Sequence, residues 1–253
     1  MLYRTVPKNG DELSILGFGC MRLPLTKERQ IDEPRAIGQI RDAIDQGVNY
    51  LDTAWPYHAG ESENVLGRAL ADGYRDKVKI ATKLPSWMIK SRQDMDAYLN
   101  AQLVKLQTDH IDYYLLHALA GDSWDHLQSI GVADFLDKAK ADGRIVNAGF
   151  SFHGLAEDFT RIVDAHAWIF CQIQYNFLDQ ENQAGIAGLH YAAARDLDEG
   201  ALVALDVNTG ACDIALRAKR PTLGLAGEFW DEVNLAAGHE FGLTSPMSWF
   251  GEG

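Results

Sequence analysis

The feature that most constrains this chain is the regular alternation of short apolar segments with longer amphipathic segments between residues 16 and 207. Short apolar runs rich in β-branched residues are typical of strands, and apolar residues at helical spacing are typical of helices packed on a sheet. Each pair of segments therefore predicts one β/α unit. A chain that repeats this unit folds into a parallel sheet covered by helices, because both faces of its apolar strands need to be buried.

The predicted elements follow one another without a linker or a low-complexity segment. The predicted strands are Leu16 to Met21, Asn49 to Thr53, Val78 to Lys83, Ile111 to His117, Ile145 to Ser151, Trp168 to Tyr175 and Ala201 to Val207. The predicted helices are Glu33 to Gln46, Ser62 to Ala71, Ser91 to Leu106, Val132 to Ala141, Ala156 to Ala165 and Ala184 to Arg195. Ahead of them, the segments Leu2 to Val6 and Leu13 to Ile15 flank turn residues and predict a β-hairpin.

The chain length of 253 residues is typical of a closed (β/α)8 barrel, the TIM barrel. Strands that are apolar along their whole length favour this barrel over an open sheet with one solvated face. After Val207 the alternation ends, and no eighth strand can be predicted. We therefore expect one α/β domain over residues 1–253, a (β/α)8 TIM barrel with an N-terminal β-hairpin, whose last β/α unit or units are uncertain or incomplete.

Composition excludes several classes of function. The 23 Lys and Arg residues against 36 Asp and Glu residues leave a net charge of −13, which disfavours a general nucleic-acid or anionic-membrane surface. Cys20, Cys171 and Cys212 are far apart, so neither a disulfide framework nor a metal site is indicated. The polar N-terminus and the lack of a long apolar stretch predict a soluble, cytoplasmic protein. Its expected partner is a small molecule, and the sequence does not define an oligomeric state.

Polar side chains occur where the predicted strands end. In a TIM barrel the carboxyl ends of the strands surround the mouth of the active site. The polar residues at these ends are Asp52, Lys83, His117, Ser151 and Gln172, and Tyr57 follows in the loop after Asp52. We therefore expect these side chains to converge.

An Asp, Tyr, Lys and His set is suited to proton transfer to a carbonyl oxygen. A phenol with an ordinary pKa of about 10 is a poor acid–base catalyst at neutral pH unless a nearby cation stabilises its phenolate. Lys83 can supply that cation, Asp52 can keep it charged, and His117 can orient the substrate oxygen. The set holds no hydride source, so a reduction would need a cofactor such as a nicotinamide, near the amide-compatible groups of Ser151 and Gln172.

The residues that carry this chemistry also resemble a known family. Asp52-Thr53-Ala54, Tyr57, Gly60, Ser62 and Glu63 are similar to the signature of the aldo-keto reductases, and further landmarks follow in the right order. These are Lys83, Asp112 to His117, Gly149 to Ser151, and Gln172 to Asn176. The resemblance covers about residues 1 to 196.

The resemblance implies a (β/α)8 barrel that reduces an aldehyde or ketone with NADPH, or with NADH. It implies that Tyr57 is the general acid, that Lys83 and Asp52 are its tuning pair, and that His117 orients the substrate. It further implies that Ser151 and Gln172 bind the nicotinamide carboxamide, with Asp52 beside the cofactor. His153 stands where many members of the family have Asn.

The segment 197–253 departs from the family pattern. The phosphate-binding loops that the family places after its last strands cannot be located, and Asp206 would repel a phosphate. Arg217, Lys219 and Arg220 form the one basic cluster, which is more typical of a solvated helix. The simplest hypothesis is a shortened chain or a diverged C-terminal sequence, for example after a frameshift.

Two other functions stay open from the sequence. One is a catalytically impaired barrel without a complete cofactor site, which would act as a binding or assembly module or be an incomplete product. The other is an aldolase-type barrel in which Lys83 forms a Schiff base, although the Asp52 and Tyr57 motif counts against it. Side chains at the rim or in long loops are as compatible with packing as with ligand contact, namely His58, His153, Trp55, Trp87 and Trp124.

Overall fold

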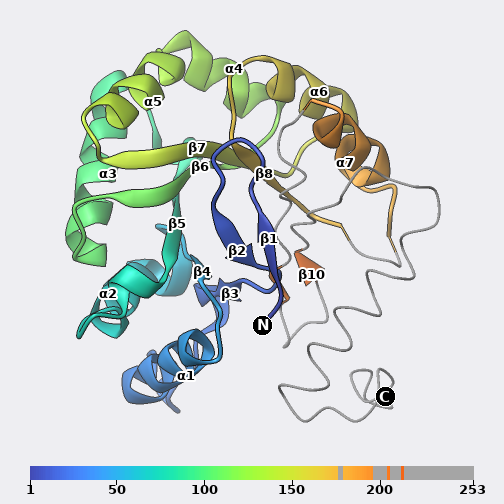
Figure 1. Ribbon diagram of the computed structural model, residues 1–253. Coiled ribbons are helices and arrows are strands. Elements are labelled where there is room, and N and C mark those ends of the chain that lie inside the picture. The colour runs from blue at the N-terminus through green and yellow to red at the C-terminus, as the bar shows by residue number, and fades with distance from the viewer. Residues whose placement is uncertain (176–178, 196–203, 206–211, 214–253) are drawn as a thin grey trace.

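Six parallel strands form the central sheet, side by side in the order in which they occur along the chain. The computed structural model describes residues 1–175 and 179–195, together with the backbone of 204–205 and 212–213. The strands of the sheet are β3 (Phe18–Gly19), β4 (Tyr50–Asp52), β5 (Lys79–Leu84), β6 (Ile111–Leu119), β7 (Ile145–Phe152) and β8 (Phe170–Ile173). Figure 1 shows this sheet curled into a half-barrel with the helices along its outer side.

A helix follows each strand from β3 onward, as the sequence predicts. The helices are α1 (Glu33–Asp45), α2 (Ser62–Ala69), α3 (Arg92–Leu106), α4 (Gly121–Ser129), α5 (Val132–Ala141), α6 (Ala156–Asp164) and α7 (Gly185–Ala193). Short 3-10 turns lie at η1 (Cys20–Arg22), η2 (Tyr57–Gly60), η3 (Arg75–Lys77) and η4 (Ser86–Met88). Local signals set some helix ends: the Asp32 side chain accepts from the Arg35 backbone at the start of α1, and Gln107 ends α3 with a left-handed φ of 54°.

The N-terminal hairpin covers the amino-terminal end of the half-barrel. Its strands β1 (Tyr3–Thr5) and β2 (Glu12–Ser14) pair antiparallel. Asn9 in the hairpin turn donates to the Asn147 side chain at 3.1 Å, and Asp11 accepts from the Tyr113 hydroxyl at 2.7 Å. Because Tyr113 and Asn147 lie near the starts of β6 and β7, the hairpin closes this end and leaves the carboxyl ends of the strands for a site.

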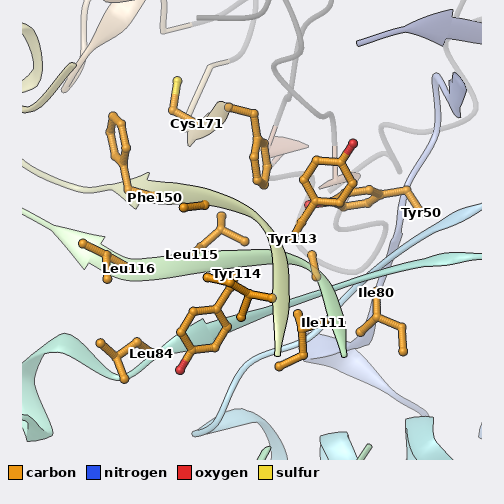
Figure 2. Close-up of a cluster of buried hydrophobic side chains, with 14 of the residues drawn as sticks. Tyr50, Ile80, Leu84, Ile111, Tyr113, Tyr114, Leu115, Leu116, Phe150 and Cys171 are labelled. Carbon is orange, nitrogen blue, oxygen red and sulfur yellow. The ribbon is translucent and has the colours of Figure 1, made fainter. Parts of the chain in front are cut away.

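Aromatic side chains fill the inside of the curved sheet. The Tyr113 ring lies beside that of Tyr50 (Figure 2), with centroids 5.6 Å apart, and its centroid is 4.9 Å from that of Phe170. Side chains of β6 therefore contact those of both β4 and β8. The next residue, Tyr114, points to the other face, toward Phe135 of α5 at 6.2 Å. This alternation follows from strand geometry, and it places one face of each strand in the barrel interior and the other against the helices.

Several features differ from the sequence prediction. The predicted strand Leu16 to Met21 is a strand only at Phe18–Gly19, because the chain then turns in η1. The helix α4 after β6 was not predicted, and β6 continues past His117 to Leu119. Within the predicted strand Ala201 to Val207, the described residues are Ala204–Leu205 (β9), which pair antiparallel with Cys212–Asp213 (β10) in a sheet separate from the parallel one. The other residues expected to complete the barrel lie outside the described residues, as does the basic cluster at 217–220.

The described part of the chain contains no helix that is both long and apolar enough to cross a membrane. Among the same residues, no group of three or more His, Cys, Asp or Glu side chains is arranged to hold a metal ion. Cys20 and Cys171 are both buried.

Candidate active site

A buried ion pair joins the carboxyl ends of β4 and β5. The Lys83 side chain lies with its Nζ 2.5 Å from Asp52 Oδ1, and the two residues are 2% and 6% exposed. Lys83 Nζ also donates to the Thr53 carbonyl at 3.0 Å. Buried charges are tolerated only when they are paired and hydrogen-bonded, so each of these residues depends on the other.

The surroundings of Lys83 keep its ammonium group charged. Burial by itself would lower the pKa of Lys83, but the charge of Asp52, the neighbouring Tyr57 and the hydrogen bonds to both raise it above its ordinary value. An amine must lose its proton before it can attack a carbonyl carbon. The raised pKa therefore argues against Lys83 as a Schiff-base nucleophile.

Tyr57 completes this cluster from the turn η2. Lys83 Nζ donates to the Tyr57 hydroxyl at 3.2 Å, and the phenol ring is half-buried. The three residues after Tyr57 all have left-handed backbone, with φ of 52° at His58, 55° at Ala59 and 93° at Gly60. For the two non-glycine residues this conformation costs about 1–3 kcal/mol each, so contacts elsewhere must hold the loop in place.

One of these contacts is made by His58. The backbone N–H of Leu23 donates to His58 Nε2 at 2.9 Å, which ties the loop to the end of η1. Burial lowers the pKa of His58, so the ring nitrogen stays available as an acceptor. The structure therefore gives His58 a place in the support of the Tyr57 loop.

His117 lies beside Tyr57. It is 9% exposed, and its ring meets the Tyr57 ring edge to face at 5.9 Å. Burial, helped by the positive charge of Lys83 and by His153, lowers the pKa of His117 to about 2, so the imidazole is neutral. Its Nδ1 is buried and has no hydrogen-bond partner within the described residues. A neutral ring with one donor and one acceptor nitrogen is suited to holding a polar ligand.

Ser151 and Gln172 come from β7 and β8. The Ser151 hydroxyl oxygen accepts from the Ala118 backbone N–H at 2.7 Å, which leaves its hydrogen free to be donated. Gln172 Nε2 donates to Asp52 Oδ2 at 2.7 Å, across the inside of the half-barrel. That bond connects the Asp52–Lys83 pair to β8, and the other amide atom, Gln172 Oε1, can act as an acceptor.

The other aromatic and histidine candidates have different positions. His153 is exposed and contacts Gln183 at 3.1 Å. Trp87 is 57% exposed, with its ring 5.1 Å from that of His117, so it borders the cluster. Of the two interpretations left open for Trp124, the structure favours packing, because Trp124 is buried on α4 and its ring packs against Trp168.

A second buried network lies behind the cluster, between β5 and the helices α2 and α3. Glu63 Oε1 accepts from Thr82 Oγ1 at 2.6 Å and from Gln102 Nε2 at 2.7 Å, and Gln102 also donates to the Lys83 carbonyl at 3.0 Å. Lys105 lies 3.4 Å from Glu63 Oε2. The sequence prediction missed Gln102 and Lys105. For Gln102 a signal was present, because this polar residue stands at helical spacing between the apolar Leu99 and Leu106.

Comparison with known proteins places this site in a family. The model of the aldo/keto reductase family matches residues 15–197, which include every residue of the cluster. The chain belongs to the aldo/keto reductase family. Sequence relatives include aldo-keto reductase YhdN of Bacillus subtilis, which is 35% identical over 125 residues, covering 46% of this chain and 38% of YhdN. The match thus spans well under half of the length of that curated aldo-keto reductase.

Solved aldo-keto reductases share the fold. The holo form of aldo-keto reductase AKR11C1 from Bacillus halodurans superimposes with a TM-score of 0.66 at 25% identity, covering 78% of this chain and 64% of that one. An aldo-keto reductase from Klebsiella pneumoniae, solved in complex with NADPH, has a TM-score of 0.61 at 24% identity, covering 78% of this chain and 66% of that one. These matches confirm the predicted TIM-barrel fold class.

Proposed function

We propose that this chain is an oxidoreductase that reduces an aldehyde or ketone to an alcohol with a nicotinamide cofactor, NADPH or NADH. The observation that carries the proposal is the contact of the Tyr57 hydroxyl with the buried Lys83–Asp52 pair, at the carboxyl ends of parallel strands. Membership of the aldo/keto reductase family and the NADPH bound by the Klebsiella pneumoniae relative support it. The substrate is a small molecule that carries a carbonyl group.

Tyr57 acts as the general acid in this proposal. A nicotinamide bound here would supply the hydride that reduces the carbonyl carbon. As the negative charge develops on the carbonyl oxygen, Tyr57 donates its hydroxyl proton to that oxygen and becomes a phenolate. The Lys83 ammonium at 3.2 Å stabilises the phenolate, and Asp52 keeps Lys83 charged throughout.

His117 orients the substrate. Its imidazole is neutral, so it donates one N–H to the carbonyl oxygen without competing with Tyr57 as a proton source. Its ring position against both Tyr57 and Trp87 puts that donor beside the phenol. The carbonyl oxygen is thereby held near two donors, of which Tyr57 gives up its proton.

Ser151 and Gln172 fit the carboxamide end of a nicotinamide. A carboxamide has one acceptor oxygen and an NH2 donor, and the Ser151 hydroxyl hydrogen and the Gln172 Oε1 acceptor would hold these two groups. Asp52 takes part in cofactor binding through Gln172, because its Oδ2 fixes the orientation of the amide. Residues that would contact the phosphates, and so select NADPH over NADH, are expected beyond residue 195, outside the described residues.

The test is a titration of the purified chain with NADPH and with NADH, followed by quenching of tryptophan fluorescence and by the shift in melting temperature. We expect saturable binding with a raised melting temperature, since a ligand that binds only the folded state stabilises it. A cooperatively folded chain that binds neither nucleotide would contradict the proposal and favour the catalytically impaired barrel. Reduction of a panel of aldehydes and ketones then defines the substrate.

A further inference from the structure

Lys105 of α3 contacts the loop that carries Tyr57 at two points. Its Nζ donates to the Gly60 carbonyl at 2.9 Å and lies 3.8 Å from the centre of the Trp55 ring. Trp55 and Gly60 stand on either side of Tyr57 in the sequence. A single ammonium group therefore contacts both ends of the short segment that presents the phenol.

This segment depends on such contacts because of its backbone. His58, Ala59 and Gly60 are all left-handed, a run that residues with side chains rarely adopt on their own. His58 is anchored to Leu23 on one side, and Lys105 anchors the segment on the other. Among the described residues these side-chain contacts hold the loop where its backbone is least favourable.

The same lysine is linked to Lys83 through one buried carboxylate. Glu63 is fully buried, with Lys105 at Oε2 and Gln102 and Thr82 at Oε1. Gln102 Nε2 in turn donates to the Lys83 carbonyl. Both partners of the Tyr57–Lys83 contact are therefore connected to the network between α2 and α3. The Tyr57 loop is connected through Lys105, and Lys83 is connected through Gln102.

We propose that Lys105 is a positioning residue, which sets the 3.2 Å contact between Tyr57 and Lys83 by clamping the Trp55–Gly60 loop; this rests on the proposed role of Tyr57. A carbonyl-polarising acid works only at hydrogen-bond distance, and a misplacement of about 1 Å costs up to about a hundredfold in rate. Lys105 touches neither substrate nor cofactor in this scheme.

The test is Lys105→Met, which keeps most of the length of the side chain but removes its donor and its charge. We expect kcat to fall by roughly tenfold with little change in the affinity for NADPH, because the loss acts on proton transfer. We also expect Tyr57 to ionise at a higher pH than in the parent chain, since its phenolate moves away from Lys83. The ionisation is followed by NMR of chain labelled with 13C at tyrosine Cζ, with Tyr57→Phe to assign the signal.

Two variants make this result specific. Lys105→Arg keeps a cation and donors for Gly60 and Glu63, and it should restore both kcat and the Tyr57 titration. Lys77→Met removes a lysine with the same kind of contacts, 4.1 Å over the Tyr74 ring and 3.1 Å from Asp45, near the amino-terminal end of β5. It should leave both readouts at the parent values.

The proposal is overturned if Lys105→Met leaves the Tyr57 titration unchanged, or if Lys77→Met shifts it equally. If Lys105→Met does not fold, the double variant Glu63→Gln/Lys105→Met removes the buried carboxylate left without its partner and is measured in the same way. The Tyr57 titration needs no turnover. A parent chain that reduces no carbonyl compound would therefore contradict the proposed function, and the titration would still test the role of Lys105.

Discussion

Two clusters of this protein each combine a carboxylate, a lysine and a tyrosine, but the group that the tyrosine hydroxyl contacts differs between them. In the network behind β5, Glu63 accepts from Thr82 and Gln102, and the Tyr114 hydroxyl donates to Gln102 at 2.8 Å. At the strand ends, Tyr57 instead meets the Lys83 ammonium.

The difference lies in the charge beside each phenol. Burial, followed by the negative charge of Glu63, raises the pKa of Tyr114 well above its ordinary value, so this phenol keeps its proton. Tyr57 lies against a cation and beside His117, whose buried Nδ1 has no partner within the described residues. A network of matched donors and acceptors supports the fold, and a cluster with an unmatched buried atom is where a ligand can complete the set.

Replacing each phenol by phenylalanine is the sharpest way to break this comparison. Tyr57→Phe should lower the rate of carbonyl reduction by about 10²- to 10⁴-fold with nearly unchanged NADPH affinity, because it removes the proposed proton donor. Tyr114→Phe is the matched control. It should lower stability by about 1–3 kcal/mol through the unpaired Gln102 amide and leave most of the rate. Steady-state kinetics and urea unfolding check both; a Tyr57→Phe variant that keeps most of its rate would remove Tyr57 from the proposed role.

Removal of the Lys83 ammonium group tests the second partner of the Tyr57–Lys83 contact. Lys83→Met should erase or shift the alkaline limb of the pH–rate profile, and it should destabilise the fold by about 3–5 kcal/mol, because Asp52 is left buried without a partner. The double variant Lys83→Met/Asp52→Asn should regain much of the stability and none of the activity. An unchanged pH profile in Lys83→Met would mean that another group tunes the phenol.

The loss of folding stability in acid is a smaller effect, and it depends on His117. Its pKa is about 2 in the folded chain, against an ordinary pKa of about 6.5 after unfolding, so the unfolded chain takes up one more proton between these values. Stability therefore falls as the pH drops below about 6.5, and His117 should account for about 2 kcal/mol of the loss between pH 7 and pH 5. His117→Asn should reduce that loss in urea unfolding. Equal slopes in the parent chain and His117→Asn would refute the neutral, buried histidine.

Much of this arrangement could be predicted from periodicity and strand ends. The predicted strands contain β3, β4, β7 and β8 or differ from them by single residues at an end, because buried parallel strands are uniformly apolar. Placing Asp52, Lys83 and His117 at strand ends was enough to expect them together, since parallel strands all end at the same side of a barrel. The amphipathic segments likewise gave the six helices that were predicted.

Other features could not be predicted because they depend on contacts between distant residues. The short helix α4 has few apolar positions, so its periodicity is weak. Trp124 looked like a loop residue until α4 placed it against Trp168. The bond from Leu23 to His58 joins residues that no spacing rule relates, and it belongs to a backbone conformation that propensities disfavour.

By itself the sequence determined the parallel β/α order, the strand-end side chains and the family, since each is written in local pattern or motif. Only the tertiary structure decided which of these side chains touch, that His117 is neutral, and that Lys105 meets both ends of the Tyr57 loop. Contact distance, burial and the charge of a neighbour arise when elements far apart in the chain pack together, and they are the quantities that set a pKa and position an acid.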